Sequence, residues 1–189
     1  MSSHQTAKLS RQLLAQVKTL PQFQQLSQAL ELLAANANLR DRLHHLASDV
    51  NLTDQERNQS LNQLISQIQI PLLRDYFLNM IAQGHWWIFQ KEPLDYFDQF
   101  VSSFQRQSDE IKVVHVVLAI EIDVAFLADF FTEMLKQQVM INYKVKPKII
   151  GGIQIKIDNL VYDYSVRTKL RLFEKEWIKS LTDNTSKLT

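Results

Sequence analysis

The sequence contains no cysteine, and only three of its 189 residues are glycine. Without cysteine, the chain can form no disulfide, no thiolate metal site and no cysteine nucleophile. No apolar run is long and uncharged enough to cross a bilayer, and residues 1–18 lack the continuous apolar core of a signal peptide. We therefore expect any membrane association to depend on a partner.

Charge is nearly balanced over the whole chain but unevenly distributed along it. The net charge of +1 argues against a large phosphate-binding surface. Residues 1–108 hold nine basic and nine acidic side chains. Residues 109–135 hold one basic and six acidic side chains, whereas residues 136–189 hold eleven basic and five acidic ones. Two explanations stay open: charge complementarity inside a small domain, or a docking surface for an acidic helical partner.

The first half of the chain shows apolar residues at helical spacing in six successive segments. Thr53, three residues before Glu56, has the pattern of a capping box, and Gly84 stands where a helix C-terminus is expected. The sixth helix is expected to begin near Pro93, with Leu94 facing inward. Six helices joined by short connections predict an antiparallel bundle.

The fifth of these segments carries an apolar stripe too wide to be covered by one neighbouring helix. Leu73, Phe77, Met80 and Ile81, together with Leu14 of the first segment, form this wide surface. Such a surface can receive an amphipathic helix of a partner in a groove. The alternative is that all five residues belong to the ordinary core of the bundle.

The pattern changes near residue 108, where a segment rich in strand signals begins. Residues 111–120 are almost wholly apolar and rich in valine, which favours a buried strand. Strict alternation predicts further strands over residues 139–145 and 153–157. A helix after the first strand is expected to turn Phe130 and Met134 inward, and a last helix with one apolar side follows the strands.

Together these segments predict an α+β protein that is mainly α. Residues 1–108 form the helical bundle, and residues 109–181 form a small domain in which two helices cover a three- or four-stranded mixed sheet. Residues 182–189 have too little apolar content to order themselves and are predicted to be a flexible tail.

Residues able to carry chemistry do not converge in a recognisable pattern. His44 and His45 point about 100° apart on a helix, so they cannot share a metal ion without other ligands. His115 lies inside the apolar strand, where we expect a core residue rather than a general base. Trp86 and Trp87 are able to stack bases, but packing between helices explains them better. We therefore expect no catalytic site, no metal, no cofactor and no nucleic-acid partner.

One run of residues in the second half has a specific order and spacing. An apolar-Gly-Gly triplet after a proline precedes an alternating strand, and an Asp-x-Ser-Val-Arg sequence then opens a helix; the residues are Pro147, Gly151, Gly152, Asp163, Ser165 and Arg167. The glycine pair marks a bend where no Cβ is tolerated. The run resembles the C-terminal signature of the delta subunit of rotary ATP synthases, the family that includes the oligomycin-sensitivity-conferring protein. Residues 72–85 are similar to the family's Arg-Asn-Phe-Leu followed by Gly-Arg, although His85 replaces the second Arg. In the C-terminal run, Tyr164 stands where the family generally has Gly.

The resemblance implies a stator role in ATP synthase, without chemistry of its own. In this family the helical domain binds N-terminal segments of the alpha subunits, and the C-terminal domain holds helices of the peripheral-stalk b subunit. The chain would resist rotor torque during proton-driven ATP synthesis as a peripheral protein. Its expected place is the cytoplasmic face of a bacterial plasma membrane, or the inner face in an organelle. The alternative is a helical adaptor or scaffold that binds amphipathic helices of another complex, and a small hydrolase is a more distant third.

Overall fold

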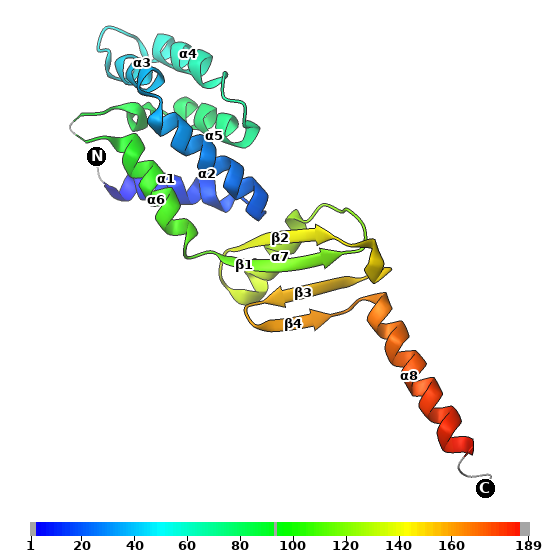
Figure 1. Ribbon diagram of the computed structural model, residues 1–189. Helices are drawn as coiled ribbons and strands as arrows, with labels where there is room; N and C mark the ends of the chain where they lie inside the picture. Colours follow the sequence, from blue (N-terminus) through cyan, green and yellow to red (C-terminus); the bar gives the residue numbers. More distant parts are fainter. Residues whose placement is uncertain (1–2, 93, 186–189) are drawn as a thin grey trace. The chain divides into compact units, whose positions relative to one another are not determined.

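The computed structural model describes residues 3–92 and 94–185, which form two compact units (Figure 1). The first unit ends at Ile111 and the second begins at Lys112. The first unit is helical and contains α1 (Ser3–Ala15), α2 (Leu20–Ala35), α3 (Ala37–Ser48), α4 (Asp54–Ile65), α5 (Pro71–Ala82), the 3-10 helix η1 (Trp86–Phe89) and α6 (Tyr96–Ser108).

Local capping signals account for several helix borders in the first unit. The capping box predicted at Thr53 is confirmed, because the Thr53 hydroxyl accepts from the Glu56 N–H at 3.3 Å and the Glu56 carboxylate accepts from the Thr53 N–H at 3.0 Å. A second capping box, between Thr19 and Gln22, begins α2. Gly84 follows α5 with a φ of 77°, the left-handed conformation expected after a helix.

Phenylalanines on α5, η1 and α6 build the core of the first unit. The ring centroid of Phe77 lies 5.6 Å from that of Phe89, 6.1 Å from that of Phe97 and 6.0 Å from that of Phe100. Aromatic pairs at these distances add to the stabilisation that each ring gains from burial. The three elements are therefore held together by one aromatic cluster.

The start of α6 differs from the prediction. α6 begins at Tyr96 because Asp95 caps it, with the Asp95 carboxylate accepting from the Asp98 N–H at 3.1 Å. Pro93, the predicted first residue, lies outside the described residues. Leu94 precedes the helix and is exposed, so the expectation that it faces inward is wrong.

The second unit is built on a four-stranded mixed sheet in the order β2-β1-β3-β4. Its elements are β1 (Lys112–Leu118), α7 (Ala125–Leu135), β2 (Val139–Val145), the 3-10 helix η2 (Pro147–Ile149), β3 (Ile153–Ile157), β4 (Leu160–Asp163) and α8 (Val166–Thr185). β1 and β2 are parallel, whereas β3 pairs antiparallel with both β1 and β4. The prediction of an α+β protein, mainly helical with a small mixed sheet, is therefore confirmed.

Helix α7 covers one face of this sheet (Figure 1). Leu127, Ala128 and Phe131 of α7 share one apolar cluster with Val114 of β1 and Ile141 of β2. Because side chains alternate along a strand, the residues next to Val114 on β1 and next to Ile141 on β2 point to the opposite face of the sheet. The sheet therefore has one covered apolar face and one open face.

Several side chains of the second unit that were predicted to be inside are exposed. Phe130 and Met134 lie on the outer side of α7, because the sheet covers only one side of that helix. His115 is exposed between the buried Val114 and Val116, and so it lies on the open face of the sheet. Its assignment to the core is wrong.

Helix α8 leaves its apolar side chains in solvent. The apolar residues of α8 up to Leu181 are exposed, so among the described helices only α7 covers the sheet, and the expectation of two covering helices is wrong. The helix continues to Thr185, past residue 182, where the flexible tail was predicted to begin. Residues 186–189 lie outside the described residues.

Candidate functional site

The five residues predicted to form a partner-binding stripe lie inside the first unit. Leu14, Leu73, Phe77, Met80 and Ile81 are each at most 3% exposed. Their side chains offer almost no surface to a partner, and their position is that of ordinary core residues. A partner helix would have to contact exposed residues elsewhere on this unit.

An apolar groove opens on the first unit between α2, the start of α3 and the segment that joins α4 to α5. It has a volume of about 380 Å³. Leu33, Leu39 and Ile68 line the groove together with Leu32, which is 64% exposed. The sequence pattern did not predict this groove. The adjacent residues Leu32 and Leu33 could have indicated it. Neighbouring residues point about 100° apart on a helix, so only one of the two can face the core and the other is left toward the surface.

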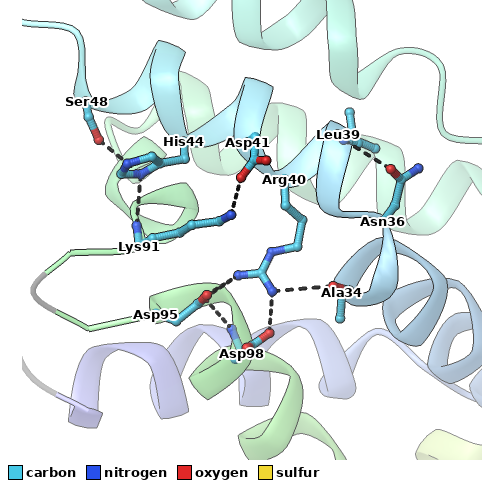
Figure 2. A network of polar contacts seen from close by, with 10 residues as sticks. All are labelled: Ala34, Asn36, Leu39, Arg40, Asp41, His44, Ser48, Lys91, Asp95 and Asp98. Carbon is cyan, nitrogen blue, oxygen red and sulfur yellow. Dashed lines mark hydrogen bonds and ion pairs between the residues drawn. The ribbon is translucent and has the colours of Figure 1, made fainter.

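Figure 2 shows a polar network that connects α3 with the start of α6. The Arg40 guanidinium forms ion pairs with Asp95 and, at 2.6 Å, with Asp98, and it donates to the Ala34 carbonyl at 3.4 Å. It also lies 5.3 Å from the centroid of the Phe97 ring. The Arg40 side chain is only 11% exposed, so two carboxylates replace much of its water. Both carboxylates are therefore paired with one nearly buried cation, which connects α3 to the start of α6.

The same network holds the segment between η1 and α6 against α3 (Figure 2). The Lys91 ammonium forms an ion pair with Asp41, and the Lys91 N–H donates to Nδ1 of His44 at 3.0 Å. The hydrogen bond and charge of Lys91 lower the pKa of the Asp41 carboxyl. His44 therefore takes part in a structural contact, and the network stabilises the unit rather than forming a reaction centre.

The two neighbouring tryptophans are occupied by packing. The Trp87 ring lies 5.4 Å from the Tyr96 ring between centroids, and the Arg57 guanidinium lies 4.3 Å from the centroid of Trp86. Trp87 is also buried. These contacts agree with the packing interpretation and leave no paired aromatic platform for bases.

In the second unit, Gly151 and Gly152 bring the connection between β2 and β3 against the start of α8. Gly152 has a φ of 76°, and a Cβ on it would lie 2.3 Å from the carbonyl oxygen of Tyr164. The Val166 N–H donates to the Gly151 carbonyl at 2.9 Å, and the Tyr164 N–H donates to the Ile153 carbonyl at 2.9 Å. The chain bends at the glycine pair, and a side chain at Gly152 would displace the backbone.

Asp163 and Ser165 organise the first turn of α8. The Ser165 hydroxyl accepts from the Thr168 N–H at 3.3 Å. The Asp163 carboxylate accepts from the Ser165 N–H at 2.9 Å, the Thr168 hydroxyl at 2.8 Å and the Gln154 amide at 3.0 Å. Hydrogen bonding from Ser165, through its side chain and then its backbone, and from Thr168 lowers the pKa of Asp163 to about 2. Ser165 therefore caps α8, and the Asp163 carboxylate at the end of β4 has a structural role in holding Ser165 and Thr168 in place.

The other two motif residues flank this junction in the chain. Pro147 begins η2, where its fixed φ suits the first position of a helical turn. Arg167 lies in the first turn of α8 and is exposed. The motif is therefore brought together mainly through backbone contacts around the two glycines.

Helix α8 presents an exposed apolar stripe. Leu170, Phe173, Trp177 and Leu181 recur at helical spacing, and more than half of the surface of each is exposed. The rings of Phe173 and Trp177 lie 5.6 Å apart between centroids. A contiguous exposed stripe of large apolar side chains marks an interaction surface.

Within residues 3–92 and 94–185, no three side chains among His, Cys, Asp and Glu gather closely enough to hold a metal ion. In that same part of the chain, no helix combines the length and the hydropathy needed to span a membrane. The carboxyls with a lowered pKa, Asp41, Glu56 and Asp163, all take part in an ion pair or in hydrogen bonds at the start of a helix. The apolar groove beside Leu32 and the apolar stripe of α8 remain as candidate interaction surfaces.

Comparison with known proteins decides the family. A model of the family described as ATP synthase delta (OSCP) subunit matches residues 11–176. The chain belongs to this family. Relatives described as ATP synthase subunit delta include that of Rickettsia bellii, which is 28% identical over 113 residues covering 58% of each chain. The delta subunit of Moorella thermoacetica is 26% identical over 146 residues, which cover 74% of this chain and 75% of the relative.

The delta family is that of a structural subunit of ATP synthase, so the protein has a stator role in the peripheral stalk and no catalytic site of its own. It is a peripheral component that associates with the membrane through partners. A chain of the Toxoplasma gondii mitochondrial ATP synthase hexamer is also similar, with a TM-score of 0.36 and 12% identity over 94% of this chain and 98% of that chain. That similarity is too low to add to the family assignment. The family suggested by the motif is confirmed.

Proposed function

We propose that the first unit of this delta-family subunit binds N-terminal segments of the alpha subunits and that the second unit binds helices of the peripheral-stalk b subunit. The observation that carries the proposal is the exposed apolar stripe of α8. An amphipathic partner helix laid against α8 would bury side chains that are otherwise left in water. The proposed functional domains, residues 1–108 and 109–181, divide close to the break between the compact units after Ile111.

The stalk contact is supported by the length and spacing of the stripe. From Leu170 to Leu181 it follows α8 for about three turns. A partner helix packed lengthwise would therefore touch all four large side chains. Because each is a little over half exposed, burying the remaining surface contributes about 1 kcal/mol per side chain toward the entropic cost of association.

For the alpha-subunit segment, we propose the apolar groove at Leu32 as the contact surface. An amphipathic helix can place its apolar side in such a groove. The buried residues Leu73 and Phe77 would then stabilise the unit without touching the segment. We further propose that α1 to α6 act as one antiparallel bundle, which would keep the groove rigid under load.

The proposed role is mechanical. Bound at both units, the chain would join the catalytic head to the stalk and resist rotor torque during proton-driven ATP synthesis through affinity and rigidity. Its place would be the cytoplasmic face of a bacterial plasma membrane, or the inner face in an organelle, without a nucleic-acid partner.

The stalk contact can be tested with two matched variants on α8. Leu170→Asp alters the stripe, whereas Leu172→Asp changes the same residue type about 200° around the helix. Their exposures are nearly equal, at 53% and 51%. In calorimetric titration with the extramembrane part of the b subunit, Leu170→Asp should weaken binding about thirtyfold, corresponding to about 2 kcal/mol. Leu172→Asp should leave the affinity unchanged, and equal losses in the two variants would refute the assigned stripe.

The alpha-subunit contact can be tested in the same way. Leu32→Asp should weaken binding of a peptide with the alpha-subunit N-terminal sequence, because it places a charge in the apolar groove. Val50→Asp is the control, since Val50 is 91% exposed between α3 and α4 and does not line the groove. Retention of full affinity by Leu32→Asp would rule out this groove as the contact.

A further inference from the structure

Six basic side chains gather on the open face of the sheet and on the adjoining turns of η2 and α8. They are termed the basic face and comprise Lys144, Lys146, Lys148, Lys156, Arg167 and Arg171. All six are exposed. They line two depressions, of about 390 and 680 Å³, that share Lys146 and Gln154. The six charges therefore form one continuous surface.

The register of the sheet sets the spacing of these charges. His115 on β1 pairs with Lys156 on β3, and Val117 on β1 pairs with Lys144 on β2. Because β1 lies between β2 and β3, the two lysines stand on strands about 10 Å apart. His115 and Val117 form the floor between them. An α-helix has about this diameter, so a helix lying along β1 would have a lysine on each side.

The basic face has few acidic neighbours. In the described part of the chain, none of its six side chains forms an ion pair or a hydrogen bond with another side chain. Asp163 and Glu174 line the larger of the two depressions, but Asp163 already accepts hydrogen bonds from Ser165 and Thr168. Cations held this close repel one another, and an anionic partner would remove that cost.

We propose that the basic face binds an acidic helical segment of the peripheral-stalk partner. The inference rests on the proposed stalk contact at α8 and adds to it a second contact surface and the charge of the partner. Arg167 and Arg171 lie on the same helix as the apolar stripe, so one partner reaches both surfaces. The small net charge of +1 disfavours a nucleic acid or a lipid surface as the occupant.

The test measures the affinity of the full-length chain for the extramembrane part of the stalk subunit from the same ATP synthase. The double variant Lys144→Glu/Lys156→Glu reverses the charge on both sides of β1 and should weaken binding about tenfold. Binding by the unaltered chain should weaken steeply between about 50 mM and about 300 mM salt, and the variant should show a smaller salt dependence. Unchanged circular dichroism melts would show that the variant is folded.

The matched control is Lys8→Glu/Arg11→Glu, which changes the net charge equally through two exposed residues of α1. Its affinity should stay within about twofold of the unaltered chain. If both double variants weaken binding equally, only net charge matters and the basic face is not a site.

Two other results distinguish this inference from the proposed function. If Leu170→Asp abolishes stalk binding while Lys144→Glu/Lys156→Glu leaves it intact, the α8 contact stands and the basic face is refuted. If the unaltered chain does not bind the stalk subunit, both are refuted. The unaltered chain is also tested with duplex DNA and with phosphatidylglycerol vesicles. If it binds one of them, and only Lys144→Glu/Lys156→Glu loses that binding while its stalk affinity is unchanged, the basic face is a site for that ligand and the proposal is refuted.

Discussion

Replacing Gly152 by alanine should destabilise the second unit by about 3 kcal/mol. The φ of 76° costs an L-residue about 1 kcal/mol, and the new Cβ would lie 2.3 Å from the Tyr164 carbonyl oxygen, where real Cβ contacts do not come under 3.0 Å. To bring this contact from 2.3 Å to 3.0 Å, the backbone must move by at least 0.7 Å. That movement disrupts the two hydrogen bonds of this junction, Tyr164 N–H to Ile153 and Val166 N–H to Gly151, each worth about 1 kcal/mol.

Two glycine variants separate these contributions. Gly84→Ala has the same positive φ with no atom within 4 Å of the new Cβ, so it should cost its own unit about 1 kcal/mol. At Gly151 the nearest atom is the Val166 Cγ2 at 3.0 Å, a side-chain atom that can shift, so Gly151→Ala should cost less than Gly152→Ala. Urea denaturation followed by hydrogen exchange of β1 and β3 amides measures the second unit. The reasoning is refuted if Gly152→Ala costs no more than Gly84→Ala.

Three further predictions concern the core and the charged groups. Phe77→Asp should unfold the first unit, because it removes a fully buried ring and buries a charge at a cost above about 5 kcal/mol; retained helical circular dichroism would contradict this. Asp163 has a folded-state pKa lowered to about 2, so its stabilising contribution is complete above pH 3.8 and is lost as the pH falls toward 2; an NMR carboxyl titration with a midpoint near 3.8 would contradict this. Arg57→Met should cost about 2 kcal/mol in urea denaturation, because the Arg57 guanidinium donates to two backbone carbonyls between α3 and α4. Arg74→Met should cost under about 0.5 kcal/mol, because Arg74 is partly exposed and pairs only with the exposed Asp75.

The helix borders of the first unit were largely predictable from short stretches of sequence. The capping box at Thr53 and the glycine after α5 are both found where they were expected. These signals work because a cap is satisfied by groups within about four residues. Asp95 was missed as the cap of α6 because the nearby Pro93 offered a competing start signal.

The partner surfaces of the first unit were not predictable in this way. Helical period shows which residues share a side of α5, but it does not show that other elements cover Phe77 and Met80 completely. The same limit applies to α2, where period could not show that Leu32 stays exposed beside a groove.

In the second unit, β1 was predicted as a buried strand with His115 in the core, because valines stand at both alternating sets of positions along the strand. Only the packing of α7 against one face decided that His115 and the nearby lysines are open to solvent, and that α8 keeps its apolar side exposed. The physical reason is that backbone conformation and capping depend on residues close in the chain. Burial depends on which elements meet in space, and a partner can still change it.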